Sequence, residues 1–360
     1  MPLNLGFIGG GLNSAVGYTH FVASKLDGNF EVSAGCFSRD PMVNSETGKA
    51  YGVASNRIYA ELDHLLAAES GILDAVCILT PTPDHADMVV KCLRAGFNVI
   101  CEKALATSVE ECQSIENAQK ETGKFLGVTF NYAGYPMIRE FRNMVTSGLL
   151  GQVQQIYCEM PQETFSRAGV NPQAWRRRDY AIPCVSLDLG VHVYQLVTYV
   201  AGVESPRNVL AKSASFGSEI EVVDTVNVLS DFEPNSLVSM MWGKSALGYR
   251  NGLRLRVFCE RGALEWCQSE PEYLHYSGPD GRRQILDRGQ EDLPIANLAR
   301  FNRFKAGHPA GFIEAFANIY ADFCGVLSGG SDLDVERHFT IEAATRGISF
   351  LELVEQLSRD

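Results

Sequence analysis

Three polar residues in this sequence have types and positions suited to proton transfer. His192 follows Asp188 by four residues in the run DLGVH, and Lys103 follows the apolar run 98–101. Histidine titrates near neutral pH, so His192 could accept the proton of a hydroxyl group and return it. On a helix Asp188 would share a face with His192, where it could bind that hydroxyl or orient the imidazole. The Lys103 ammonium could hydrogen-bond an oxygen atom that develops negative charge.

Each of these residues also has an ordinary structural explanation when it is taken alone. A single histidine on a helix is more often structural, and a lysine that follows a strand is commonly a solvated strand end. The occurrence of Lys103, Asp188 and His192 in one chain with a glycine-rich loop favours catalytic roles for all three.

That glycine-rich loop lies near the start of the sequence and could bind a dinucleotide. Residues 3–8 are an apolar, strand-like run, and Gly9, Gly10 and Gly11 follow it directly. Gly9 would allow the sharp bend, Gly11 would leave room for the pyrophosphate, and the next helix would offer its N-terminus. Ser14 stands where the motif G-x-G-x-x-G has its last glycine, and a small residue there still permits close helix packing. A tight turn without a ligand is the alternative, but the strand–glycine–helix order favours a cofactor site.

The residues after the second predicted strand bear on the choice between NAD and NADP. An NAD site usually has an acidic residue here, which binds the ribose hydroxyl. In this chain the first polar residues are Ser38 and Arg39, which could bind a 2′-phosphate, and Asp40 is close enough to serve as the acid. The pattern favours NADP, with NAD and a plain polar turn before Pro41 left open.

The elements that would position these residues alternate in the first third of the chain. Apolar runs predict strands at 3–8, 31–37, 75–79, 98–101 and 125–129, and helical spacing predicts helices at 14–26, 88–95 and 109–122. Short buried strands separated by helices are typical of a parallel sheet covered on both faces, which is the doubly wound arrangement.

The pattern changes near residue 131, where strands begin to dominate. Several runs alternate apolar and polar residues, as in LRLRVFCE, which is typical of an open, largely antiparallel sheet with one packed face. The predicted strands are 153–160, 208–215, 225–231, 237–242, 253–260 and 263–267, and the predicted helices are 137–147, 187–200, 312–324 and 338–357. We therefore predict an α/β fold with a Rossmann, NAD(P)-binding domain at 1–131 and a substrate-binding and oligomerisation domain at 132–360.

Composition and charge exclude several classes of function. The chain has 360 residues and a formal net charge of −12, so nucleic-acid binding is not expected. No apolar run approaches the roughly 20 residues of a membrane helix, and no basic-then-apolar leader opens the chain. We expect no membrane association and a cytoplasmic location. Ten cysteines without a C-x-x-C pair favour reduced, buried thiols and no metal site.

Three motifs occur in an order that resembles a known family. They are T-P-T-P-D-H at 80–85, C-E-K-A at 101–104 and D-L-G-V-H at 188–192, and the tail at 307–320, GHPAGFIEAFANIY, is similar to sugar-dehydrogenase-like members. With the glycine loop they resemble the glucose–fructose oxidoreductase / inositol dehydrogenase (Gfo/Idh/MocA) family over nearly the whole chain. The resemblance implies hydride transfer between NAD or NADP and a secondary alcohol or ketone carbon of a sugar, cyclitol or sugar derivative.

The resemblance also implies roles for particular residues. Lys103, Asp188 and His192 match the catalytic residues, with His192 as the acid and base. The expected cofactor-binding residues are Gly9, Gly11, Leu12, Asn13, Ser14, Ser38, Arg39, Thr80, Pro81, His85, Glu102 and Lys103. Ala104 stands where the family has a proline that often follows a cis peptide bond. Since a cis bond before another residue costs about 3 kcal/mol, we expect a trans bond here unless the site enforces the cis form.

Substrate selection is expected to fall to the second domain. An arginine just before the Asp188 helix could pair with a carboxylate or phosphate on the substrate. The predicted substrate-binding residues are Tyr132, Trp175, Arg176, Asp188, His192 and His308. For residues 175–179, a solvated or subunit-contact face is an equally good explanation.

The resemblance leaves three functions to distinguish. The first is an NAD(P)-dependent sugar or polyol dehydrogenase. The second is a glycoside-cleaving enzyme of the same fold that retains its NAD, and the third is a non-catalytic nucleotide-binding regulator. Regulators of this fold commonly lose the lysine or the histidine, so Lys103 and His192 favour an enzyme. We also expect a homodimer or homotetramer formed through the open sheet, because a large exposed sheet face usually needs covering.

Overall fold

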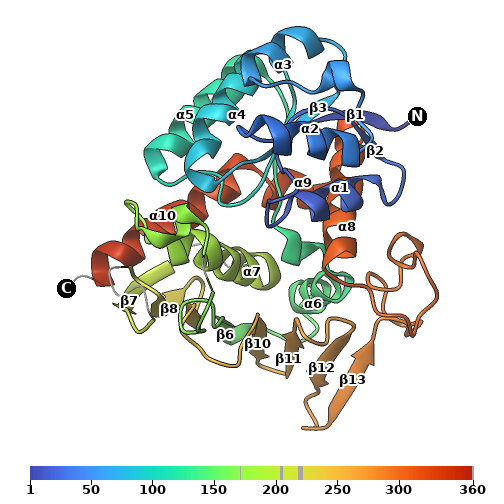
Figure 1. The fold of residues 1–360 in the computed structure, drawn as a ribbon. Coiled ribbons are helices and arrows are strands. Elements are labelled where there is room, and N and C mark those ends of the chain that lie inside the picture. Colours follow the sequence, from blue (N-terminus) through green and yellow to red (C-terminus); the bar gives the residue numbers. More distant parts are fainter. Residues whose placement is uncertain (171, 203–205, 218–221, 359–360) are drawn as a thin grey trace. The chain divides into compact units, whose positions relative to one another are not determined.

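The computed structural model describes residues 1–170, 172–202, 206–217 and 222–358, which form two compact units. The first unit comprises Met1–Asn131 together with Phe312–Arg346, and the second comprises Tyr132–Gly311 together with the residues from Gly347 onward. The division expected from the sequence kept all of 132–360 together. The observed division differs from this expectation at Phe312–Arg346. This segment belongs to the first unit because α8 (Phe312–Leu327) packs on α1 (Gly17–Lys25), as Figure 1 shows.

The first unit contains a five-stranded parallel sheet with the spatial order β2-β1-β3-β4-β5. Its strands are β1 (Leu3–Gly9), β2 (Phe30–Cys36), β3 (Ala75–Leu79), β4 (Val99–Cys101) and β5 (Leu126–Val128). The central strand β3 is buried at every position. A sheet covered on both faces requires this apolar run, so the predicted doubly wound parallel sheet is confirmed.

The first unit also contains helices, and three of them escaped prediction. The helices of this unit are α1, α2 (Pro41–Ala50), α3 (Leu62–Glu69), α4 (His85–Arg94), α5 (Val109–Thr122), α8 and α9 (Leu333–His338). The three are α2 and α3, which are short and have little apolar periodicity, and α9, which has only 6 residues. α2 still carries a start signal, because Asp40 is its N-cap and Pro41 its first residue.

The second unit contains an eight-stranded sheet with the order β13-β12-β11-β10-β6-β9-β8-β7. Its strands are β6 (Val153–Pro161), β7 (Pro206–Ala214), β8 (Thr225–Phe232), β9 (Ser236–Gly243), β10 (Arg254–Cys259), β11 (Gly262–Cys267), β12 (Tyr273–Ser277) and β13 (Arg283–Asp287). The pair β6–β9 is parallel and the other pairs are antiparallel. The predicted open, mostly antiparallel sheet is therefore confirmed.

One face of this sheet is packed and the other is open. Burial alternates along β8, and α6 (Pro136–Thr146) and α7 (Val191–Ala201) lie on the packed face. Phe350 of α10 (Ile341–Ser358) stacks on Tyr194 of α7, at 4.6 Å between ring centroids. The large apolar side chains exposed on the strands of this sheet are Leu210, Leu229, Leu237, Phe258, Tyr273 and Ile285.

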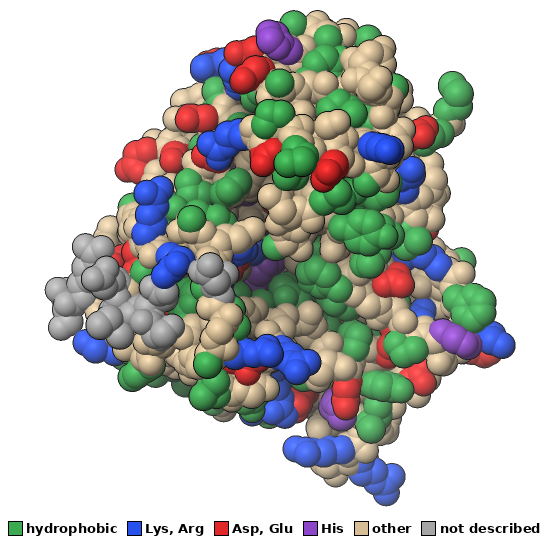
Figure 2. Space-filling model, in the orientation of Figure 1, with side chains coloured by type: hydrophobic (Ala, Val, Ile, Leu, Met, Phe, Trp, Pro, Cys, Tyr) green, Lys and Arg blue, Asp and Glu red, His purple; other side chains and the backbone are tan. Residues whose placement is uncertain are grey.

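The β12–β13 hairpin at the edge of the sheet was not predicted, because its strands are short and polar. Arg282 and Arg283 lie exposed at its turn, and Figure 2 shows basic side chains gathered at this tip. Charge on an edge strand opposes pairing with another strand.

All ten cysteines are free, and seven of them are buried, in line with the expected reduced thiols. No helix among residues 1–170, 172–202, 206–217 and 222–358 is long and apolar enough to cross a membrane.

Candidate functional site

The glycine loop of the first unit forms a narrow turn at the end of β1. Gly9 and Gly10 both have positive φ, at +81° and +74°, which favours glycine. A Cβ atom on Gly9 would lie 2.8 Å from the backbone of Leu79, so a side chain there cannot fit. The Tyr51 hydroxyl donates to the Gly10 carbonyl at 3.1 Å, and burial raises the pKa of Tyr51 to about 12, which keeps the donor proton in place.

Gly17 takes the packing role that was assigned to Ser14. A Cβ atom on Gly17 would lie only 2.2 Å from the carbonyl oxygen of Gly10. The Ser14 hydroxyl instead accepts a hydrogen bond from the Gly17 N–H at 3.2 Å. The helix therefore begins at Gly17 rather than at residue 14, which corrects the predicted start. The signal was present as a further glycine, three residues beyond the motif position. The contact of Ser14 with a cofactor remains a prediction.

The outer part of this loop is open to solvent. Leu12 and Asn13 are exposed, and the Leu12 N–H donates to the Thr47 hydroxyl at 3.0 Å. Their predicted contact with a cofactor remains a prediction.

Thr80 supplies an observation that fits a dinucleotide beside the glycine turn. Its hydroxyl oxygen is buried, and no hydrogen-bond partner lies within reach among the residues that the structure describes. Thr80 follows β3 directly, and its backbone N would lie 2.9 Å from a Cβ placed on Gly9. Pro81 comes next and opens a short 3₁₀ turn. A buried hydroxyl without a partner is costly in a folded protein, so a ligand that pairs with it would be stabilised here.

The residues after β2 have separate tasks. The Asp40 carboxylate accepts from the N–H groups of Met42 and Val43, at 2.8 and 3.3 Å, and so caps α2. The Ser38 hydroxyl accepts from the Asp40 N–H at 3.1 Å. The Arg39 side chain is 89% exposed and pairs with Asp84 at 3.2 Å.

His85 connects the ends of two neighbouring strands. Its Nε2 lies 2.8 Å from the Thr80 carbonyl and its Nδ1 lies 2.7 Å from the Ala104 carbonyl. Burial lowers the pKa of His85, although the two carbonyl oxygens act in the opposite direction. Both ring nitrogens of His85 thus lie against backbone carbonyl groups, and its predicted contact with a cofactor remains a prediction.

The peptide bond between Lys103 and Ala104 is cis, so the expected trans bond was wrong. Ala104 is fully buried, and its carbonyl oxygen is the one that faces His85. Lys103 follows β4 (Val99–Cys101) by two positions, at the carboxyl end of the parallel sheet, where doubly wound sheets bind ligands.

Glu102 lies in a buried polar network beneath Lys103. Its carboxylate accepts from the Thr129 hydroxyl and lies 3.0 Å from His20 Nε2, and the other ring nitrogen of His20 lies 2.8 Å from the Tyr320 hydroxyl. Burial acts to raise the pKa of Glu102, but His20, Lys103 and Thr129 outweigh it and hold this pKa below its usual value. Glu102 thus supports the strand end that carries Lys103. Sequence reasoning missed His20 and Tyr320, which are 300 residues apart.

In the second unit, His192 is buried against the ring of Tyr132. Its imidazole is 4% exposed and meets the Tyr132 ring edge-on, at 4.7 Å between centroids. The Tyr132 hydroxyl accepts from the Asn251 amide at 2.9 Å, and burial raises the pKa of Tyr132, so this phenol stays neutral. The structure therefore brings Tyr132 and His192 together, and it adds Asn251, which had no signal in the sequence.

Asp188 precedes His192 in a π-helical turn, Ser186–Gly190, rather than in the regular helix that was predicted. Such turns are rare and often occur at functional sites. The Arg176 guanidinium forms a fork on the Asp188 carboxylate, with Nε 3.1 Å from Oδ2 and Nη2 3.4 Å from Oδ1. The Lys244 ammonium pairs with Oδ2 as well. Arg176 therefore pairs with a carboxylate of this chain, and its contact with a substrate remains a prediction. Lys244 is a partner of Asp188 that sequence reasoning missed.

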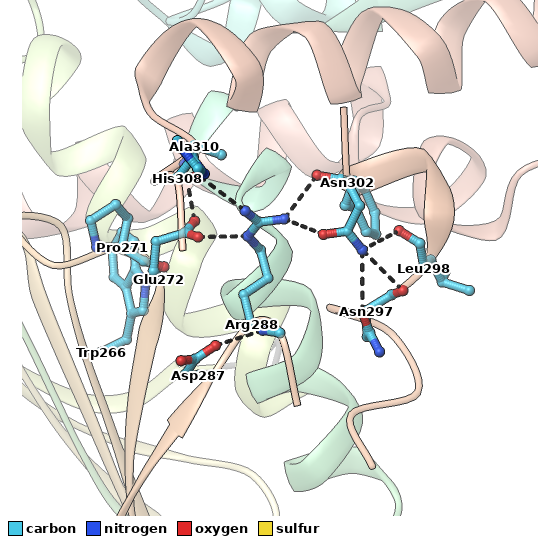
Figure 3. A network of polar contacts seen from close by, with 12 residues as sticks. Trp266, Pro271, Glu272, Asp287, Arg288, Asn297, Leu298, Asn302, His308 and Ala310 are labelled. Carbon is cyan, nitrogen blue, oxygen red and sulfur yellow. Dashed lines mark hydrogen bonds and ion pairs between the residues drawn. The ribbon is translucent and has the colours of Figure 1, made fainter. Parts of the chain in front are cut away.

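Trp175 and His308 have other surroundings. The Arg176 guanidinium stacks over the Trp175 ring at 4.4 Å. His308 is exposed in the loop that follows β13, where its ring meets Phe304 at 4.6 Å between centroids. Figure 3 shows that the His308 carbonyl belongs to a network around Arg288, a buried side chain that also pairs with Glu272 at 2.7 Å. His308 as a substrate contact remains a prediction.

Gln195, on α7 three residues after His192, was also missed. Its side-chain amide is buried, and neither its oxygen nor its nitrogen has a hydrogen-bond partner among the residues that the structure describes. Residues three apart on a helix share a face, so Gln195 adds a polar group on the side of His192.

Comparison with known proteins finds relatives of both halves of the chain. Residues 3–130 match the model of an oxidoreductase family with an NAD-binding Rossmann fold, and residues 138–265 match the model of the GFO/IDH/MocA C-terminal domain. The two matches together span more than half of the chain, so the similarity is not confined to the glycine loop.

Individual relatives agree with these matches. The uncharacterized oxidoreductase YfiI of Bacillus subtilis is 31% identical over 374 residues, covering 98% of this chain and 93% of that protein. Inositol 2-dehydrogenase of Rhizobium meliloti is 25% identical over 289 residues, covering 78% and 80%. The crystal structure of an inositol dehydrogenase homolog from Azotobacter vinelandii, complexed with NADH and myo-inositol, is 28% identical with a TM-score of 0.91, covering 100% of this chain and 96% of that one.

Proposed function

Since this chain belongs to the GFO/IDH/MocA family of oxidoreductases, we propose that it is an NAD(P)-dependent dehydrogenase of a sugar, cyclitol or sugar derivative. The observation that carries the proposal is the grouping of Tyr132, Asp188 and His192, three predicted substrate residues, within one unit. The inositol 2-dehydrogenase relative and the homolog bound to myo-inositol support the substrate class.

The residues present fit the oxidation of a secondary alcohol. His192 takes the hydroxyl proton, and the role predicted for the Lys103 ammonium is to stabilise a developing alkoxide. A bound nicotinamide would accept the hydride from the carbinol carbon, so that the C–O bond becomes a carbonyl. Asp188 remains a carboxylate and binds a substrate hydroxyl. In the reverse direction His192 returns the proton to the carbonyl oxygen.

The first unit's residues fit the cofactor. Gly9, Gly10 and Gly17 allow the tight turn between β1 and α1, and the Thr80 hydroxyl offers a buried polar partner. We propose NADP over NAD, because Asp40 is engaged in capping α2 while the exposed Arg39 can reach a 2′-phosphate. The homolog from Azotobacter vinelandii is complexed with NADH, so the preference of this chain needs a direct measurement.

The experiment that tests the function is a substrate panel with both cofactors. Sugars, inositols and nucleotide sugars are each offered with NAD⁺ and with NADP⁺, and reduction is followed at 340 nm. We expect a polyol or sugar that reduces the cofactor, with higher kcat/KM for NADP⁺. Tight cofactor retention with substrate cleavage but no net change at 340 nm would indicate the glycoside-cleaving alternative. Cofactor binding without any turnover would indicate a regulator.

We also propose that the open face of the eight-stranded sheet forms a homodimer or homotetramer. Leu210 and Leu229 are opposite each other on β7 and β8 and are 67% and 42% exposed. With Leu237, Phe258 and Ile285 they place apolar side chains on most strands of the sheet. Light scattering should give a mass that is a multiple of the 39.5 kDa chain, and a purely monomeric mass would contradict this proposal.

A further inference from the structure

Lys244 is a buried cation beside the proposed substrate site. It follows β9 directly, its side chain is 3% exposed, and its ammonium pairs with Asp188 Oδ2. The ammonium also lies 5.5 Å from the centroid of the Phe165 ring. A buried ammonium is costly unless it is paired, so this placement of Lys244 depends on the Asp188 carboxylate.

The backbone of Lys244 is fixed on both sides. Its N–H donates to the Asp224 carbonyl at 2.8 Å, and its own carbonyl accepts from the Phe165 N–H at 2.8 Å. The side chain therefore extends from a rigid strand end, which positions a functional group better than a free loop does.

The end of β9 also contacts the backbone turn Ser186–Gly190, which carries Asp188. The Trp242 indole N–H donates to the Ser186 hydroxyl at 3.0 Å. A Cβ atom on Gly190 would lie 2.8 Å from the Trp242 ring, so the turn is in close contact with this side chain. β9 thus fixes the backbone that carries Asp188 through Trp242 and the Asp188 carboxylate through Lys244.

The Asp188 carboxylate is held by two cations from different segments. Arg176 binds both of its oxygen atoms, and Lys244 binds Oδ2. Arg176 is 20% exposed at its side chain, whereas Lys244 is almost fully enclosed. An ionised carboxylate only accepts hydrogen bonds, so a group that it binds on the substrate must be a donor.

We propose that Lys244 is a positioning residue for a substrate with two adjacent hydroxyl groups. It fixes the Asp188 carboxylate so that this group accepts a hydrogen bond from the hydroxyl next to the one that His192 deprotonates. This inference rests on the proposed dehydrogenase function. It predicts that Lys244 matters for the neighbouring hydroxyl and not for the reacting one.

The test compares two substrates in three variants. The substrates are the best polyol of the panel and its analogue that lacks the hydroxyl next to the reacting carbon. In Lys244→Met, kcat/KM for the polyol should fall roughly 10- to 100-fold, the value of a hydrogen bond to a charged group, while kcat/KM for the deoxy analogue stays within about threefold of wild type. Asp188→Asn removes the acceptor itself and should lower kcat/KM for the polyol at least as much as Lys244→Met does. Lys244→Arg retains the charge and should recover most of the activity on the polyol.

Thermal unfolding separates positioning from a failure to fold. Lys244→Met removes the buried cation and leaves the Asp188 carboxylate on Arg176, so the variant should stay folded at the assay temperature and unfold in one cooperative transition. The control is Lys212→Met, an exposed lysine of β7 in the same sheet, which should leave both substrates unaffected.

The outcomes separate the two proposals. An equal loss on both substrates in folded Lys244→Met would overturn the positioning role and leave the dehydrogenase function standing. A wild-type protein that oxidises no polyol with either cofactor would overturn the function itself, and the substrate role of Lys244 with it.

Discussion

The two units build their candidate sites from different parts of the chain. In the first unit the site is mainly backbone, with a turn at Gly9 and Gly10 and a helix that begins at Gly17. In the second unit the site consists of side chains, with Arg176 and Lys244 on the Asp188 carboxylate and Tyr132 against His192.

This difference decides what each site tolerates. A backbone site depends on the absence of side chains, so it fails when a Cβ atom is added. A side-chain site depends on charges and hydrogen bonds from several strands, so it fails when one partner is removed and another stays buried. Substitutions in the two units should therefore have effects of different kinds, on cofactor binding in the first and on turnover in the second.

The largest effect is expected at His192. In His192→Ala, kcat should fall by about 10²- to 10⁴-fold because the proton acceptor is lost. The affinity for the reduced cofactor, measured by fluorescence titration, should remain within about twofold of wild type. The matched control is His64→Ala, an exposed histidine of α3 in the first unit.

Unchanged turnover in His192→Ala would remove this residue from the mechanism. A large loss of cofactor affinity would contradict the claim that substitutions in the second unit affect turnover alone, because His192 would then be needed for cofactor binding.

The next effect is expected at Gly17. A Cβ atom there would lie 2.2 Å from a carbonyl oxygen, and backbone cannot move aside as a side chain can. Gly17→Ala should lower the free energy of unfolding by about 3 kcal/mol and weaken cofactor binding. The control is Gly325→Ala in α8, where nothing lies within 4 Å of the added atom and a gain of about 1 kcal/mol is expected. Equal stabilities of the two variants would contradict the close helix–loop contact.

The sequence predicts the backbone site better than the side-chain site. A glycine-rich turn is encoded by consecutive residues, so Gly9 and Gly11 could be identified without knowledge of the fold. Even there, Ser14 was assigned a contact that belongs to Gly17, because the motif specifies a spacing while the packing depends on where the helix begins.

The side-chain site was predicted only as far as its motifs extend. The motif DLGVH identifies Asp188 and His192. Lys244 lies 56 residues from Asp188 in the sequence. It comes close to Asp188 only in the folded chain, where it follows β9, the strand that pairs with β6 and β8. The sequence contains no local pattern that links such residues. The cis bond before Ala104 and the buried pair of His20 with Glu102 escaped prediction for the same reason, since each depends on contacts that form only in the folded chain.

Glu102 is an exception to this division between the units. It is a buried charged side chain in the first unit, whose site is otherwise formed mainly by backbone. Burial acts to raise its pKa, but His20, Lys103 and Thr129 together hold that pKa below its usual value of 4.5. A carboxylate whose folded pKa is lowered stabilises the protein fully above its unfolded pKa and loses this contribution as the pH falls through the folded pKa. Stability should therefore decline below about pH 4.5 partly through this group.

Glu102→Gln tests this effect. The free energy of unfolding of the variant should be lower by about 2 kcal/mol at neutral pH, because His20 loses its charged partner. Below neutral pH, this free energy should depend less on pH than it does in wild type. Denaturant unfolding at pH 7 and at several values between about pH 3 and 5 measures both. Glu121→Gln, at a surface pair with Arg94, is the control and should change little. If the stability of Glu102→Gln falls with decreasing pH as steeply as that of wild type, Glu102 does not contribute to the loss of stability in acid.

The smallest effect is expected at Arg39, and it tests whether any side chain of the first unit selects the cofactor. Its guanidinium is 89% exposed and pairs with the partly exposed Asp84, so solvent and salt weaken this pairing. Arg39→Ala should lower kcat/KM for NADP⁺ about 5- to 10-fold, since the variant lacks a charged donor for the 2′-phosphate, and should leave kcat/KM for NAD⁺ unchanged. Raising the salt concentration should reduce the difference in kcat/KM for NADP⁺ between wild type and variant, because the lost interaction is electrostatic and exposed. Equal losses with both cofactors would mean that Arg39 supports the fold of the loop rather than the choice of cofactor, and the first unit would then bind either dinucleotide through its backbone alone.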